Sequence, residues 1–297
     1  KQGERPVIER LLLGVVRSLR VSVSAWCVQG WRAAFFPYGD VEMSTTIPQL
    51  TAEQIAALST SAIAALTKDD WKVFTEEQLQ ALTTSQLKAL STQSLYALSA
   101  ANIQALSADQ IQALTSTALK SLSTQAVAAL SADQLQALGT NQLRFLTTTE
   151  MRALTTAQID ALSDEQVASL SSSMVSALSA AQMEALSSSD IASLSSLAIR
   201  SLGSAQIQAL SEDQVDGLSA AQVRALATSS VAAMSTTVIN SLDEEQIGAL
   251  TSSQVQALNT DQIHALSVDQ IQALSTSAIK SLNTKAIAAL DTEQVSA

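Results

Sequence analysis

Hydrophobic residues recur along most of this chain with a period of eight. Numbering from Thr51 gives thirty complete octads and then a shorter one, Asp291–Ala297, with no insertion or deletion between them. Position 8 of the octad is Leu except at Phe74 and Met234, and position 5 is aliphatic or Met except at Trp71. Position 1 is mostly Ser or Thr, position 4 is most often Gln and position 7 is usually Ala or Ser. Each octad therefore carries one apolar pair in a constant polar frame.

A single long helix does not accommodate this period. Eight residues advance an α-helix by about 800°, so the pair at positions 5 and 8 would rotate by about 80° with every octad. The apolar stripe would wind around the helix and give no face that could be buried. Heptads and eleven-residue repeats, which produce coiled coils, are absent as well.

The order of residues within an octad predicts the start of a short helix. In the segment Leu106–Leu114, Ser107 is a favoured N-cap and Gln110 follows three residues later, which is the pattern of a capping box. Leu106 precedes the cap and Ile111 stands at the fourth helical position, as in a hydrophobic staple. The next Ser or Thr begins another helix, so each octad predicts two helical turns and a tight corner.

Helices this short do not persist alone in water, because nucleation is unfavourable below about 12–15 residues. They become stable when their apolar side chains pack against neighbouring repeats, as in a solenoid. We therefore expect an all-α solenoid of very short, two-turn helices, one per 8-residue repeat. Positions 5 and 8 should form the core, small residues at position 7 should let helices approach closely, and positions 1 to 4 and 6 should face water.

Two other structures were weighed against the solenoid. An eight-residue period also suits strands, but strict alternation would place positions 5 and 8 on opposite faces of a sheet. The abundance of Ala, Leu and Gln favours helix over strand. Ser/Thr-rich low complexity is typical of disorder, but the regularly spaced Leu argues against a disordered chain. A weaker period of five octads links the similar octads at Ser195, Ser235 and Ser275. We attribute it to duplication, with a superhelical turn as the alternative.

Charge narrows the range of partners. The formal net charge is -11, and it is uneven: residues 1–50 carry six Lys or Arg against four Asp or Glu, whereas residues 51–297 carry ten against twenty-three. An acidic array repels phosphate backbones and anionic membranes, so we expect no nucleic-acid partner. No apolar run of roughly 18 residues is present, so no membrane span is expected.

The first 42 residues do not follow the octad pattern. They contain Trp26, Trp31 and Cys27, and residues 43–50 lead from Met43 into the first octad. Three interpretations stay open for 1–42: a poor match to a secretory signal, a small anchoring cap, or upstream sequence translated through a misplaced start. The third is favoured, with Met43 as the natural first residue.

Catalytic and metal-binding groups are sparse. The many Ser and Thr are expected helix caps, His264 stands at a position that is Gln in other octads, and with one Cys no intrachain disulfide can form. Acidic pairs such as Glu244-Glu245 lack the ligand spacing and glycine of a calcium loop, and they suit the first turn of a helix. We therefore expect that the protein is not an enzyme and that it binds no metal, no cofactor and no small-molecule substrate.

Non-consensus residues mark possible contacts with a protein partner. Trp71 and Phe74 occupy positions 5 and 8 of the octad TKDDWKVF, where bulky core is the alternative interpretation. Arg144, Phe145 and Arg152 interrupt the consensus in two successive octads. These five residues are the predicted partner-contact sites, for another protein or for self-association.

The octads LTTSQLKAL, LTTAQIDAL and LSADQIQAL resemble the LSxxQIxA octapeptide arrays of large predicted bacterial surface, adhesion or haem-utilisation exoproteins. The resemblance covers residues 50–297 and implies a bacterial source and an extracellular or cell-surface location in preference to a cytoplasmic one. The haem label gains no support from a chain with one His. A likeness to the first helix of transcription-activator-like effector repeats does not extend to their base-reading loops.

These observations predict a non-enzymatic structural or interaction protein: a surface spacer, a fibre or an adhesin-like segment. The alternative is an intracellular solenoid scaffold that binds a protein or peptide partner along its length, as other solenoids do.

Overall fold

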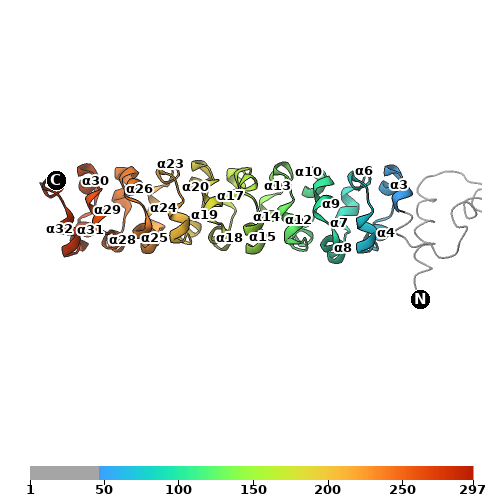
Figure 1. Ribbon diagram of the computed structural model, residues 1–297, viewed down its shortest axis with the longest axis horizontal. Helices are drawn as coiled ribbons and strands as arrows, with labels where there is room; N and C mark the ends of the chain where they lie inside the picture. Colours follow the sequence, from blue (N-terminus) through green and yellow to red (C-terminus); the bar gives the residue numbers. More distant parts are fainter. Residues whose placement is uncertain (1–46, 297) are drawn as a thin grey trace, which may run out of the picture. The chain divides into compact units, whose positions relative to one another are not determined.

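The computed structural model describes residues 47–296, and all their regular structure is helical (Figure 1). The chain divides into two compact units after Leu138. The described part of the first unit begins with a 3₁₀ turn, Ile47–Gln49, and each octad from Thr51 onward then contributes one α-helix of four to six residues. The predicted all-α class, with one short helix per octad, is confirmed.

The first unit contains eleven of these helices. They are α3 (Ala52–Ala56), α4 (Thr60–Ala64), α5 (Lys68–Lys72), α6 (Glu76–Gln80), α7 (Thr84–Lys88), α8 (Thr92–Ala97), α9 (Ala100–Ala105), α10 (Ala108–Gln112), α11 (Ser116–Lys120), α12 (Thr124–Ala128) and α13 (Ala132–Gln136).

The second unit contains the other twenty. They are α14 (Thr140–Leu143), α15 (Thr148–Ala153), α16 (Thr156–Asp160), α17 (Asp164–Ala168), α18 (Ser172–Ala177), α19 (Ala180–Glu184), α20 (Ser188–Ser193), α21 (Ser196–Arg200), α22 (Ser204–Gln208), α23 (Glu212–Asp216), α24 (Ala220–Ala225), α25 (Thr228–Ala233), α26 (Thr236–Ser241), α27 (Glu244–Ala249), α28 (Ser252–Ala257), α29 (Thr260–His264), α30 (Val268–Ala273), α31 (Thr276–Ser281), α32 (Thr284–Ala289) and α33 (Thr292–Ser296).

The predicted capping box starts most of these helices. In α10 the backbone N–H of Gln110 donates to Ser107 Oγ at 3.2 Å, and the Ser107 N–H donates to Gln110 Oε1 at 2.8 Å. Each box satisfies two backbone donors that the start of a helix leaves free. The preceding Leu106 is extended, with φ −72° and ψ 144°, so the corner between helices is made by one or two extended residues.

Within each unit nearly every helix packs against the helix three octads further along the chain. Examples are α3 with α6 in the first unit, and α17 with α20 and α28 with α31 in the second. The side chains at positions 5 and 8 fill the interior: Ile103, Ile191 and Ile247 are fully buried. The predicted core positions are confirmed, and the core runs along the inside of a coil of short helices.

The prediction that position 4 faces water is wrong. Apart from the half-buried Gln54 and Gln142, the glutamines at this position are buried, with 1% of Gln254 and at most 7% of any other buried one exposed. The Gln254 Oε1 accepts the N–H of its own N-cap residue, Thr251, at 2.8 Å. Its Nε2 donates to the carbonyl oxygens of Val223 and Leu226, both at 2.9 Å, which belong to the helix four octads earlier.

The same double connection recurs through both units. At least thirteen position 4 glutamines donate to carbonyls 28 and 31 residues back, among them Gln86 in the first unit and Gln222 in the second. Since helices pack three octads apart and glutamines reach four octads back, one turn of the coil takes between three and four octads. The five-octad period is therefore not the period of the coil.

Position 7 lies where the coils approach one another. The Ser201 Oγ donates to the carbonyl of Ser172 at 3.0 Å, 29 residues earlier. A Cβ on Gly217 would lie 3.1 Å from the Ser188 carbonyl oxygen, also 29 residues earlier. Nearly every octad has Ala, Ser or Gly at this position, as the sequence predicted, and Val73 and Phe145 are the exceptions.

Two further predictions concern membranes and the first residues. No helix in the described part of the chain is long and apolar enough to span a bilayer. The interpretations of residues 1–42 as signal, cap or mistranslated segment concern residues outside the described range.

Candidate interaction surface

Side chains at three positions of the octad take almost no part in capping, in the core or in contacts between coils. Position 1 caps a helix, position 4 links coils, position 7 is restricted in size, and positions 5 and 8 are core. Side chains at positions 2, 3 and 6 are mostly exposed. These three positions, with the exposed Phe145 at position 7, are therefore the side chains that a partner could contact.

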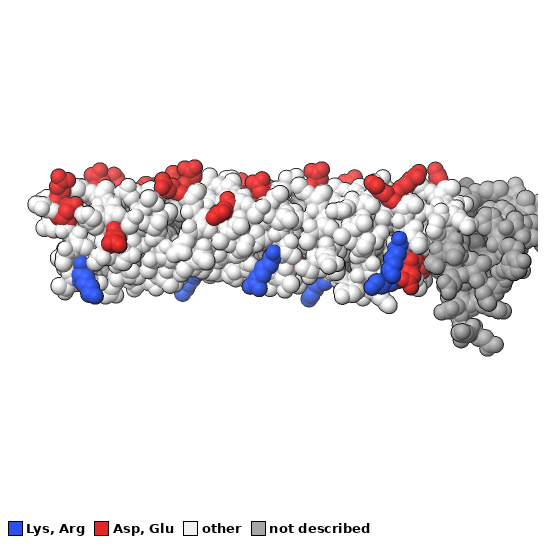
Figure 2. All heavy atoms as spheres, in the orientation of Figure 1, with Lys and Arg blue, Asp and Glu red and all other residues white. Residues whose placement is uncertain are grey.

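Most of the carboxylates at positions 2 and 3 form a row that we call the acidic ridge, and Asp69 and Asp261, also at position 3, are not counted in it. In Figure 2 most Asp and Glu side chains gather along one edge of each unit. Its members recur at steps of three or four octads, or of two coils, so that each lies one or two coils beyond the last. They are Glu53, Glu76, Glu77, Asp109 and Asp133 in the first unit, and Asp164, Glu165, Glu212, Asp213, Glu244, Glu245 and Asp269 in the second, all exposed.

Cations at position 6 form a second row, the basic ridge. Figure 2 shows Lys and Arg side chains along the edge of each unit away from the acidic ridge. They recur at similar steps along the chain. The members are Lys88 and Lys120 in the first unit, and Arg144, Arg200, Arg224 and Lys280 in the second, all exposed, whereas Lys72 and Arg152, also at position 6, do not follow these steps.

The two ridges do not neutralise each other within the chain. Among residues 47–296 the ion pair formed is Lys72 with Asp69 at 2.8 Å, and neither belongs to a ridge. The hydrogen bond and the charge of Lys72 lower the pKa of Asp69. On the acidic ridge, hydrogen bonds from Thr51 and from its own backbone lower the pKa of Glu53. The ridges are thus rows of charge open to an external partner.

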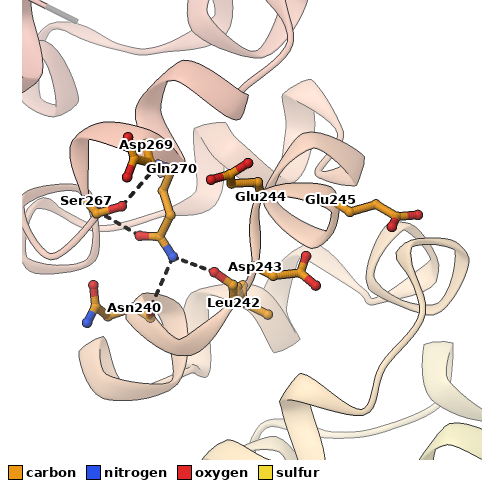
Figure 3. Close-up of a pocket in the computed structure, with 8 residues that line it drawn as sticks. All are labelled: Asn240, Leu242, Asp243, Glu244, Glu245, Ser267, Asp269 and Gln270. Atoms are coloured by element: carbon orange, nitrogen blue, oxygen red, sulfur yellow. Dashed lines mark hydrogen bonds between the residues drawn. The ribbon is translucent and has the colours of Figure 1, made fainter.

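A hollow in the second unit interrupts the acidic ridge between α27 and α30. Asp243, Glu244, Glu245 and Asp269 contribute carboxylates to its lining, and Gln270 closes its floor by bonding to the Leu242 carbonyl at 2.7 Å (Figure 3). Glu244 points toward the side of Asp269, whereas Glu245 extends the other way (Figure 3).

Its volume of about 470 Å³ would admit a small molecule. Pockets for drug-like ligands, however, are walled mainly by apolar side chains, and here Leu242 is the one apolar residue of the lining. The hollow is a widening of a charged surface.

Two carboxylates, Glu150 and Asp190, stand at glutamine positions in the interior of the second unit. Asp190 is buried, and its Oδ2 accepts from the N–H and the Oγ of Ser187 at 2.9 and 2.7 Å. Burial raises the pKa of Asp190, the Ser187 bonds act against that rise, and the nearby Asp164 of the acidic ridge adds to it. A carboxylate here cannot donate to a carbonyl as glutamine does.

The predicted partner-contact residues divide into two groups. Trp71 is fully buried and Phe74 nearly so, with ring centroids 4.9 Å apart, and the Trp71 Nε1 has no hydrogen-bond partner. These two rings are bulky core and present no exposed ring to a partner. Phe145 is 48% exposed and follows the exposed Arg144 in the sequence. Arg152 donates to the Ala177 carbonyl at 3.2 Å. These three residues stay available for contact.

Groups suited to catalysis or metal binding do not gather in the part of the chain that the structure describes. His264 is exposed at position 6 of α29, and no three His, Cys, Asp or Glu side chains there come together as a metal ion would require. The Ser and Thr at position 1 are engaged as N-caps.

The ridges themselves were missed from the sequence. Each acidic pair, taken alone, is explained by the dipole at a helix start. The signal that could have revealed the ridge is the step of three or four octads between pairs, which becomes meaningful once the length of a coil is known.

Comparison with known proteins identifies the repeat. No curated protein matches the chain. The ALTTAQ repeat matches eight overlapping segments: 79–116, 109–140, 135–172, 185–220, 199–228, 225–260, 239–276 and 270–297. Together these segments span well over half of the 297 residues. This chain therefore belongs to the ALTTAQ repeat family.

Proposed function

We propose that this chain is a non-enzymatic structural protein of the bacterial cell surface, serving as a spacer, a fibre or an adhesin-like segment. The observation that carries the proposal is the use of the octad. Five of its eight positions maintain the coil, and the remaining three place charge on the outside at every turn. Such a surface suits repeated weak contacts along a length of chain, whereas catalysis requires a dry pocket with converging reactive groups.

Repetition also supports a mechanical role. In a solenoid each repeat contacts its neighbours alone, so length changes by adding or removing repeats without redesign of a common core. The buried glutamine links fit this role, because each one fastens a helix to the turn before it. A spacer needs this property, and a binding site of fixed shape does not.

Protease shaving of intact cells of the producing organism tests the proposal. An antibody against the repeat should detect loss of the protein after treatment of whole cells, while a cytoplasmic marker stays intact. Protection until the cells are lysed would refute the surface location.

That second outcome would favour an intracellular scaffold. The observation on its side is the exposed Phe145, flanked by Arg144, because exposed aromatic and arginine side chains are enriched at protein interfaces. The scaffold would then be expected to lose its partner on Phe145→Ser and to keep it on the matched change Thr149→Ser.

A further inference from the structure

In the described part of the chain most exposed charges at positions 2, 3 and 6 lie on two edges that do not meet, while a few, such as Asp160, Glu184 and Asp216 at position 6, belong to neither ridge. The acidic ridge and the basic ridge are exposed, and no ion pair joins them among residues 47–296. Random placement at positions 2, 3 and 6 would mix the signs on every edge. The separation instead leaves one face with anions and another with cations in each unit (Figure 2).

Several exposed large apolar side chains lie beside the basic ridge, whereas Ile287 and Val295 are exposed on the last two helices, α32 and α33. Leu197, 70% exposed, lies on α21 one helical turn before Arg200, and the half-exposed Phe145 adjoins Arg144. Tyr96, 68% exposed, occupies position 6 of α8. This helix packs against α11, the helix that ends at Lys120. Large apolar side chains set among arginines are typical of the centre of a protein interface. The acidic ridge has none of them.

The spacing of the two ridges is matched by construction. Packed helices lie about 8–10 Å apart, so ridge charges one coil apart are separated by roughly that distance and those two coils apart by roughly twice that distance. Two copies of the same coil have the same spacing. An acidic ridge on one copy can therefore meet a basic ridge on another at several coils at once, which an unrelated partner matches only by chance.

We propose that two copies of this chain associate side by side, with the acidic ridge of one copy against the basic ridge and its apolar side chains on the other. Each exposed ion pair contributes little alone, so the contact depends on several pairs acting together. The exposed Leu197 and Phe145 add apolar area that the ion pairs alone do not supply. This inference does not depend on where the protein resides in the cell.

Salt should affect the association in a defined way. At about 0.15 M ionic strength the screening length is roughly 8 Å, so the general repulsion between two acidic chains is damped while contacts across the interface persist. At about 1 M salt it falls to roughly 3 Å and the contacts are screened too. We expect side-by-side dimers near physiological ionic strength and monomers at high salt.

Charge reversal on the full-length chain tests the proposal. One variant, Arg200→Glu with Arg224→Glu, places acidic side chains on both edges over α21–α24; another, Glu212→Lys, Asp213→Lys, Glu244→Lys and Glu245→Lys, places basic side chains on both edges over α22–α27. Sedimentation velocity should show each variant as a monomer and an equal mixture of the two as a heterodimer. Asp261→Lys, which lies on neither ridge, is the control and should dimerise like the wild type.

Circular dichroism confirms that each variant is folded before sedimentation is interpreted. A wild-type chain that stays monomeric at physiological salt overturns the proposal. So does dimerisation of the single variants at wild-type strength, which would place the contact elsewhere, or a mixture that fails to associate.

Carbodiimide cross-linking supplies a second readout on the unmodified chain. It joins a lysine to a carboxylate in contact with it. Lys120 and Lys280 have no carboxylate partner within the described chain, so links from them to acidic-ridge residues should join an isotope-labelled copy to an unlabelled one. Links confined to a single copy would contradict side-by-side pairing.

Discussion

At the scale of single residues, the glutamine at position 4 carries more of this fold than its polarity suggests. Its carbonyl oxygen accepts from the N-cap of its own helix, and its amide hydrogens go to carbonyls at the end of a helix four octads earlier. Helix ends leave four carbonyls without partners. Glutamine satisfies some of them with one side chain, and its burial follows from where those carbonyls lie.

Replacing Gln254 by Glu should therefore be costly. The carboxylate keeps an acceptor for Thr251 but places charge, without a donor, against the Val223 and Leu226 carbonyls. We expect a loss of at least about 1–3 kcal/mol in the free energy of unfolding, measured by urea titration followed by circular dichroism. The matched control is Gln256→Glu on the exposed position 6 of the same helix. An equal loss in both variants would show that added charge, and not the lost donor, destabilises the coil.

Replacing Asp190 by Asn is expected to have the opposite effect on the free energy of unfolding. Asn102 shows that an amide of the same length can bond its own N-cap and donate to a carbonyl 31 residues back, that of Trp71 at 3.2 Å. Asp190→Asn should stabilise the chain at neutral pH by about 1 kcal/mol. Urea unfolding at pH 7 measures the gain, and a loss of stability would mean that the carboxylate has a partner that an amide cannot replace.

The same variant should alter the pH dependence. Because burial raises the pKa of Asp190, the folded chain binds this proton more tightly than the unfolded chain does. Its contribution to stability is therefore complete below the ordinary carboxyl pKa and is lost as the pH rises through the raised one. The stability difference between Asp190→Asn and the wild type should grow with pH across that interval and stay small in acid. A difference that is constant with pH contradicts this account.

At the scale of elements, each octad is a helix that depends on its cap. Where Ser or Thr occupies position 1, its side chain accepts an N–H from position 4, but Ala227 at the start of α25 has no such bond. Its backbone is already extended, with φ −67° and ψ 147°, as N-caps are. The helix forms nevertheless, held by its neighbours.

Ala227→Ser should supply the missing cap. We expect a gain of about 1 kcal/mol in the free energy of unfolding, since N-cap Ser exceeds Ala by roughly that amount. Thermal or urea unfolding measures it. Ala232→Ser, inside the same helix, is the control and should be neutral or slightly destabilising. A gain at both sites would point to a general effect of serine on solubility.

The local part of this fold could be predicted from the sequence, and the long-range part could not. The cap at Ser107, the box with Gln110 and the core role of Ile111 follow from residues a few positions apart. The second partner of Gln110 is the Leu79 carbonyl, 31 residues away, and nothing near Gln110 in the sequence reveals it. The ridges were hidden for the same reason, because their alignment depends on how many octads make one coil.

At the scale of the whole molecule, sequence distance becomes direction around the coil. Residues three or four octads apart share an edge, and those one octad apart face different sides. The net charge of -11 therefore describes the surface poorly. The chain is better described as two opposed rows of charge in each unit.

Deleting one octad separates folding from surface pattern. Removal of residues 219–226 keeps every core and cap position in phase, so helix content per residue by circular dichroism should stay at the wild-type value. Downstream charges in the second unit turn by one octad relative to upstream ones, so the ridges break and side-by-side dimers should weaken in sedimentation. Removal of residues 219–222 alone should disrupt the helices that follow. If the octad deletion dimerises normally, ridge alignment is not what holds the copies together.

The glutamine links also give this coil a direction in time. The carbonyls at the end of a helix accept hydrogen bonds from a glutamine that the ribosome adds about thirty residues later, as the Val223 carbonyl does from Gln254. Each turn is thus completed by the chain that follows it, and the growing end is always the least finished part. Folding in the order of synthesis therefore requires only contacts with the turn made just before. A chain that emerges through a narrow exit could fold one turn at a time as it appears.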